Sequence, residues 1–85
     1  MGIHTLLQEL GFSEYEARAY VSLVNGSPRN GYEVDKASGL PRASVYPVLE
    51  KLVQRGGARR RDTREGVRYV ATPPARMVQR IDKTH

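Results

Sequence analysis

The stretch that decides the fold is LPRASVYPVLEKLVQRGG, from Leu40 to Gly57. Its apolar residues recur at the three- and four-residue spacing of one helical face: Val45, Val48, Leu49 and Leu52. This spacing predicts a helix over residues 42–56, with that face against a core. The other face carries small, aromatic and polar residues, so it is available to contact a partner: Arg42, Ala43, Tyr46, Pro47, Glu50 and Gln54.

The segments on either side of this helix complete a recognisable order. A turn at Gly39-Leu40-Pro41 separates it from a shorter predicted helix at 30–38, which gives a helix, a tight turn and a second helix. The segment ARRRDTREGVRYVA at 58–71 then predicts a basic β-hairpin. We therefore expect an α+β, mostly α fold: a winged helix-turn-helix with a two-stranded hairpin as the wing.

The remaining elements are predicted from helix periodicity and capping residues. We expect helices at 3–10 and 13–25 and a short carboxy-terminal helix at 75–83. Ser13 with Glu16 forms the spacing of a capping box, and Asn30 with Glu33 repeats it. Residues 27–29 are too few for more than a connector or a single β-bridge to the hairpin.

Details of the predicted hairpin and of the main helix carry further expectations. The strands are expected at 58–61 and 67–71, and the first has little besides Ala58 to bury. Pro47 lies about six residues into the main helix, where it removes an amide donor, so a kink or an irregular first turn is expected. Four tyrosines lie on apolar faces and are predicted to be core residues: Tyr15, Tyr20, Tyr32 and Tyr69.

Length and composition place the chain among small globular domains. Its 85 residues, 39% of them hydrophobic, suffice for one domain spanning 1–85. No apolar run approaches the ~20 residues of a membrane span, so no membrane association is expected. The chain has no cysteine and no visible secretory signal, which favours a cytoplasmic, nucleoid-associated location.

The charge is strongly asymmetric along the chain. Residues 1–40 hold three Lys/Arg against five Asp/Glu, whereas residues 41–85 hold eleven against four. The second half therefore has a net charge of +7 and the first half a net charge of −2, which add up to +5 for the chain. Such a one-sided positive field suits a polyanion such as double-stranded DNA. Composition alone supports equally the alternative that these arginines keep the domain soluble.

The predicted helix at 42–56 supplies the first group of candidate DNA-binding residues. Arg42 can pair with guanine or bind a phosphate. The alternative is that it is simply a solvated arginine near the start of a helix. Ala43 can contact a thymine methyl group, and Ser44 can donate a hydrogen bond to a phosphate. Ser44 can equally serve only the hydrogen bonds of the first turn of its own helix. Tyr46 points away from the apolar face and is assigned either to DNA or to packing under the hairpin. The full group is Arg42, Ala43, Ser44, Tyr46, Pro47 and Lys51.

The hairpin supplies the second group. Five arginines lie within it, offset locally only by Asp62 and Glu65: Arg59, Arg60, Arg61, Arg64 and Arg68. A run of charge is usually a solvated face, but a hairpin directly after such a helix can straddle the sugar-phosphate backbone. Because strand side chains alternate, we expect only some of the five to reach DNA at once.

The sequence contains no pattern that indicates catalysis. It has no glycine-rich phosphate loop, no nucleophile beside a base and no suitably placed pair of carboxylates. His4 and His85 lie at opposite ends without ligand spacing, so neither a metal site nor a cofactor is expected. We do not expect an enzyme.

Several segments together resemble a known family. LLQELGFSEYEARAY, KASGLPRASVY, the VLEKL helix and RYVATPP resemble the amino-terminal winged-helix domain of TrmB-like transcription regulators over roughly Leu6 to Met77. GYEV at Gly31 and VYPVL at Val45 also resemble PadR-like regulators, which are winged-helix proteins as well. The first hairpin strand departs from the TrmB-like pattern, with ARRR where more apolar residues are usual.

The resemblance implies a DNA-binding role for two segments. The helix from Arg42 would enter the major groove and the hairpin from Arg59 to Arg68 would act as the wing. It also implies a homodimer on a two-fold-related operator. TrmB-like proteins carry a carboxy-terminal sugar-sensing domain, and we expect no such effector domain within these 85 residues, whether they are a piece of a regulator or a stand-alone domain.

Two other functions remain open at this point. The domain can be a protein-interaction module that docks an acidic partner through its arginines and the apolar side of 75–83, formed by Met77, Val78 and Ile81. RNA binding by the hairpin has less support, because the sequence shows no exposed run of stacking aromatics.

Overall fold

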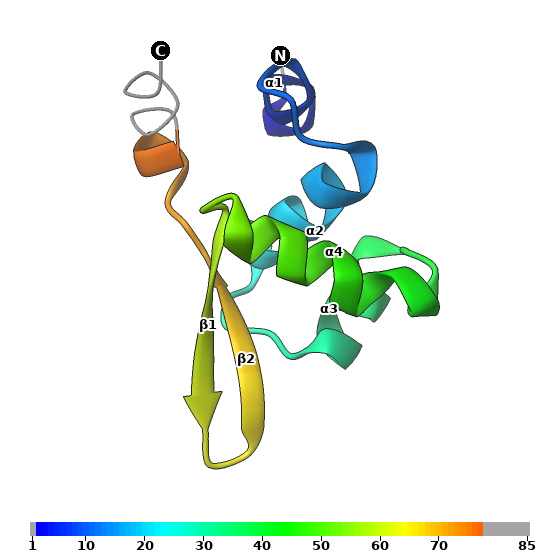
Figure 1. The fold of residues 1–85 in the computed structure, drawn as a ribbon, viewed down its shortest axis with the longest axis vertical. Coiled ribbons are helices and arrows are strands. Elements are labelled where there is room, and N and C mark those ends of the chain that lie inside the picture. Colours follow the sequence, from blue (N-terminus) through cyan, green and yellow to red (C-terminus); the bar gives the residue numbers. More distant parts are fainter. Residues whose placement is uncertain (1, 78–85) are drawn as a thin grey trace.

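The computed structural model describes residues 2–77 and shows a mostly helical α+β fold (Figure 1). Its elements are α1 (Ile3–Glu9), α2 (Glu14–Asn25), α3 (Gly31–Ser38), α4 (Arg42–Gln54), β1 (Ala58–Thr63) and β2 (Gly66–Ala71). The hairpin of β1 and β2 extends away from the helices. This is the predicted winged helix-turn-helix. None of the described helices is long and apolar enough to cross a membrane.

The capping residues set the helix boundaries as the sequence predicted. The Ser13 hydroxyl oxygen accepts a hydrogen bond from the Glu16 amide, and the Glu16 carboxylate accepts one from the Ser13 amide. This capping box fixes the start of α2. Asn30 and Glu33 do the same for α3. Gly39 ends α3 in the left-handed conformation, with φ of 70°, and this allows the sharp turn into α4.

The core lies between the helices and the base of the hairpin. Its largest fully buried side chains come from α2, α3 and α4: Tyr20, Leu23, Val34, Val45, Leu49 and Leu52. The Tyr20 hydroxyl donates to the Thr72 carbonyl oxygen, so the core is tied to the chain that leaves β2. Burial raises the pKa of Tyr20 to about 12.

The hairpin is antiparallel, with pairs from Ala58 and Ala71 to Thr63 and Gly66. The expected five-residue connection at 62–66 was wrong, because only Arg64 and Glu65 lie between the strands. Thr63 closes this short turn: its hydroxyl donates to the Gly66 carbonyl oxygen and accepts the Glu65 amide. Gly66 has φ of 124°, which a residue with a side chain would adopt only with strain.

The connector before α3 pairs with β2 at a single point. Arg29 forms an isolated antiparallel bridge with Tyr69, with amide-to-carbonyl distances of 3.0 and 2.8 Å. This confirms the predicted β-bridge. As expected, β1 buries only Ala58, while Tyr69 faces the core from β2.

Several finer predictions need correction or lie outside the described part. α4 is one helix from Arg42 to Gln54 with Pro47 inside it, so the proline does not end the helix, and the kink stays a prediction. Tyr20 and Tyr69 are buried as predicted, but Tyr15 and Tyr32 are 38% and 54% exposed, so the core prediction was wrong for these two.

The carboxy-terminal helix is described only at its start. A helical turn begins at Pro74, and residues 78–83 of the predicted helix lie outside the described residues. Met77 is only 3% exposed, because it packs beside α1. The apolar side proposed for partner docking therefore does not include Met77.

Candidate nucleic-acid interface

The outer side of α4 brings most of the first candidate group to the surface. The Arg42 side chain is 84% exposed and Tyr46 is 59% exposed. Ala43, Pro47 and Lys51 are exposed as well. Ser44 differs, because it is half-buried and its amide donates to the Pro41 carbonyl oxygen over 2.8 Å.

Arg42 is held loosely by the preceding helix. Its Nε lies 3.7 Å from Oδ2 of Asp35 in α3. An exposed pair of this kind contributes little stability, on the order of 0–1 kcal/mol, but it biases the guanidinium toward the crevice between α3 and α4. That crevice has a volume of about 260 Å³. The Arg42 guanidinium is therefore exposed and only weakly paired.

Tyr46 rests on the first turn of α3. A Cβ atom built on Gly31 would lie 2.4 Å from Cζ of Tyr46, so only glycine lets the ring approach so closely. The ring therefore lies across the α3–α4 crevice, with much of its surface open to solvent. Tyr32 and Lys36 border the same region, with the Lys36 Nζ 4.9 Å from the Tyr32 ring centroid.

The hairpin divides its arginines between two faces. Strand alternation puts Arg60 on the side of buried Tyr69, where its Nη1 lies 4.0 Å from Glu50 of α4. Arg59 and Arg61 lie on the opposite side, and Arg64 lies in the turn. These four are exposed, so they can meet a polyanion.

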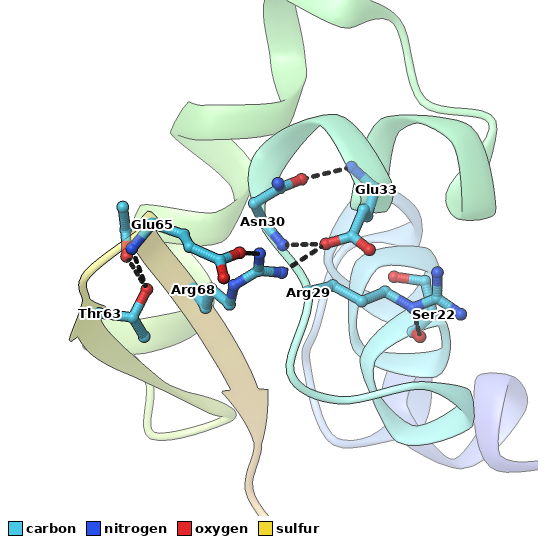
Figure 2. A network of polar contacts seen from close by, with 8 residues as sticks. Ser22, Arg29, Asn30, Glu33, Thr63, Glu65 and Arg68 are labelled. Atoms are coloured by element: carbon cyan, nitrogen blue, oxygen red, sulfur yellow. Dashed lines mark hydrogen bonds and ion pairs between the residues drawn. The ribbon is translucent and has the colours of Figure 1, made fainter.

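Arg68 is arranged differently from the other four hairpin arginines (Figure 2). Its side chain is 23% exposed and donates to Glu33 over 2.9 Å and to Glu65 over 3.0 Å. The Asn30 amide, and secondly Arg68, lower the pKa of Glu33 below its ordinary value of 4.5. Arg68 thus connects β2 to the start of α3, and its charge is already matched by carboxylates.

Two other arginines hold the helices together. Arg29 donates to the Ser22 carbonyl oxygen over 3.0 Å (Figure 2). Arg55, at the end of α4, donates to Gly11 and Glu16 and lies 4.2 Å from the Phe12 ring centroid. The partners of Arg55 are 39 and 44 residues away in sequence, so no local pattern shows them.

A groove of about 460 Å³ flanks the same outer side of α4. Ala43, Pro47 and Lys51 form one wall, and Tyr15 at the start of α2 forms the other. The sequence prediction missed Tyr15 because its spacing matches the buried stripe of α2. Residues 2–77 contain no cluster of His, Cys, Asp or Glu able to hold a metal ion.

Comparisons with known proteins agree with this architecture. Uncharacterized protein YrhO of Bacillus subtilis strain 168 is 53% identical over 51 residues, which are 60% of this chain and 18% of that protein. The HTH-type sugar sensing transcriptional regulator TrmBL1 of Pyrococcus furiosus is 38% identical over 50 residues, 59% of this chain and 15% of that protein. The chain therefore spans less than a fifth of the length of either relative.

Solved structures share the fold. The structure of TrmBL2, an archaeal chromatin protein with a novel mode of DNA binding, superposes with a TM-score of 0.87 at 30% identity, over 96% of this chain and 32% of that one. The transcriptional regulator Tm0710 of Thermotoga maritima has a TM-score of 0.70 at 14% identity, over 94% of this chain and 58% of that one, and shows the fold alone.

The family assignment rests on a family model that matches most of the chain. The model of the TrmB family, described as sugar-specific transcriptional regulators, matches residues 7–75 and so covers α2 to β2 completely. The chain belongs to the TrmB family of winged-helix transcription regulators.

Proposed function

We propose that this chain binds double-stranded DNA sequence-specifically, as a transcription regulator or the DNA-binding part of one. In this proposal the outer side of α4 enters the major groove and the hairpin lies on the sugar-phosphate backbone. The observation that carries it is the placement of charge. Arg59, Arg61 and Arg64 are exposed on a projecting hairpin, and no ion pair among residues 2–77 involves them.

The two surfaces have different roles in this proposal. Exposed arginines on the hairpin supply sequence-independent affinity, because each phosphate contact releases condensed counterions. Arg42, Ala43 and Tyr46 lie on one side of α4 and supply base contacts. Arg68 positions the hairpin, since its charge is already paired with Glu33 and Glu65.

The relatives support this proposal and extend it to the whole regulator. TrmBL1 is a sugar-sensing transcriptional regulator and TrmBL2 is a chromatin protein that binds DNA. By analogy, we propose that the chain acts on chromosomal DNA as a homodimer, with each copy contacting one half of a two-fold-related operator. Response to a sugar would reside in parts of such regulators that the matched region does not cover.

Fluorescence-anisotropy titration of a labelled duplex across a salt series tests the proposal. We expect log Kd to rise steeply with log salt, and unlabelled duplex DNA to compete better than RNA of the same length. Arg64→Gln should lower the slope by about 0.9. The matched control is Arg18→Gln, because Arg18 lies on α2 and pairs with Glu14. Salt-insensitive binding, or preferential competition by RNA, would contradict the proposal.

A further inference from the structure

A second basic feature lies at the base of the hairpin, where the chain leaves β2. It is a hollow of about 380 Å³ bordered by arginines from two separate segments: Arg59, Arg60 and Arg61 from β1, and Arg76 from the turn after Pro73. Val70 and Pro73 contribute apolar surface. We call it the arginine hollow.

The strand register shows which face of the hairpin carries the arginine hollow. Arg59 pairs with Val70, and both lie on the side opposite buried Tyr69. Arg61 shares that side, whereas Arg60 points to the α4 side and pairs with Glu50. The arginine hollow therefore lies on the face of the hairpin away from α4, outside the contacts proposed for the major groove.

The floor of the arginine hollow is held rigidly. Thr72 borders it and is 5% exposed. Its amide donates to Gly57 over 3.0 Å, its hydroxyl donates to Gly56 over 2.7 Å, and its carbonyl oxygen accepts the Tyr20 hydroxyl. All three polar groups of Thr72 are thus hydrogen-bonded, and the Arg76 amide donates to the Pro73 carbonyl oxygen over 2.9 Å.

Within residues 2–77, the arginines of the hollow other than Arg60 have no carboxylate partner. Among residues 2–77, no ion pair involves Arg59, Arg61 or Arg76. Guanidinium groups stay protonated at any ordinary pH, so the three cations repel one another in the unliganded chain. A phosphate group carries up to two negative charges and accepts bidentate hydrogen bonds from guanidinium, so it would relieve this repulsion.

We propose that the arginine hollow is a phosphate-binding site, with Arg59, Arg61 and Arg76 as its ligands. The phosphate belongs either to a nucleic-acid backbone or to a free oligophosphate. In the first case the site rests on the proposed DNA binding and adds a contact that no part of α4 can make. In the second case it stands independently of that function.

Titration with sodium pyrophosphate, at ionic strength held constant with sodium chloride, tests the site directly. Heteronuclear NMR follows the arginine Nε–Hε signals of the 15N-labelled chain. We expect saturable chemical-shift changes at Arg59, Arg61 and Arg76. In Arg76→Gln we expect the apparent dissociation constant for pyrophosphate to rise at least fivefold. Arg18→Gln removes the same charge on α2, outside the arginine hollow, and should leave the apparent dissociation constant for pyrophosphate within twofold. Absence of saturable shifts, or equal weakening by both variants, would overturn the site.

A second titration, with duplex DNA, identifies the source of the phosphate. If it is a DNA backbone, the duplex displaces pyrophosphate, and Arg76→Gln lowers the salt slope of duplex binding by about 0.9. If it is a free oligophosphate, duplex and pyrophosphate bind together. If the chain binds duplex DNA but the three arginines respond to neither ligand, the site is overturned and the proposed function stands. If pyrophosphate binds at the three arginines but duplex DNA does not bind, the site stands and the proposed function is overturned.

Discussion

Arg68 in β2 and Glu33 in α3 are joined by a hydrogen-bonded ion pair of 2.9 Å across 35 residues of sequence. The same Oε1 atom of Glu33 accepts the Asn30 amide over 3.0 Å, so one carboxylate both caps α3 and holds the hairpin (Figure 2). The carboxylate of Glu33 thus contributes both to the start of α3 and to the attachment of the hairpin.

Acid should loosen this connection. The pKa of Glu33 is lowered from 4.5 in the folded chain, so the fold favours the carboxylate. This contribution is complete above pH 4.5 and is lost as the pH falls through the lowered folded pKa. We expect thermal unfolding midpoints to fall less between pH 6 and about pH 3 in Glu33→Gln than in the unmodified chain. Parallel curves for the two proteins would contradict this role, and Glu14→Gln serves as an exposed control.

Arg64 and Arg68 should separate DNA contact from positioning. We expect Arg64→Ala to lower the salt slope of duplex binding by about 0.9 without changing stability. Arg68→Ala should cost about 1 kcal/mol of unfolding free energy, because it removes the partly buried cation that Glu33 and Glu65 share, and it should change the salt slope less. Urea denaturation and anisotropy titrations of both variants measure the two effects. Identical changes of slope would place Arg68 on the DNA as well.

Arg55 should stabilise the fold rather than contact DNA. It is 39% exposed but pairs with Glu16, whose side chain is 4% exposed. Arg55→Ala leaves that carboxylate buried without its cation, and we expect a loss of about 2 kcal/mol in urea denaturation. Arg18→Ala removes an exposed pair with Glu14 and should change stability by less than about 0.5 kcal/mol. Equal losses in the two variants would rule out the proposed importance of burial.

Gly31→Ala should displace Tyr46. The new methyl group would lie 2.4 Å from the ring, but the ring is the exposed end of a movable side chain and can turn away. We expect less than about 1 kcal/mol of destabilisation, a shift of the Tyr46 ring signals in NMR, and weaker duplex binding, as in Tyr46→Ala. In the Tyr46→Ala background the same substitution should leave binding unchanged. An additive loss would show that Tyr46 is not the group through which Gly31 acts.

The parts of the fold that sequence predicted well are those fixed by local spacing. The buried face of α4 follows from the positions of Val45 and Leu49, and the starts of α2 and α3 follow from Ser13 and Asn30. Each depends on residues three or four positions apart, where the geometry of a helix leaves little choice.

What sequence could not show depends on distant partners. Tyr32 has helical spacing like that of Tyr20, but no core side chains cover it, so its side chain is exposed. Arg68 looked like the other hairpin arginines, and only the fold brings Glu33 to it. For the same reason Arg76, which meets β1 only at the arginine hollow, was not among the expected contacts.

Selection from a randomised duplex pool, with sequencing of the retained fraction, tests the central claim most directly. We expect an enriched motif with two-fold-related halves for the unmodified chain. For Arg42→Ala we expect relaxed preference at one position in each half, worth about 1–3 kcal/mol on the preferred site. A retained pool with the same base composition as the starting pool, for both proteins, would contradict sequence-specific binding through α4.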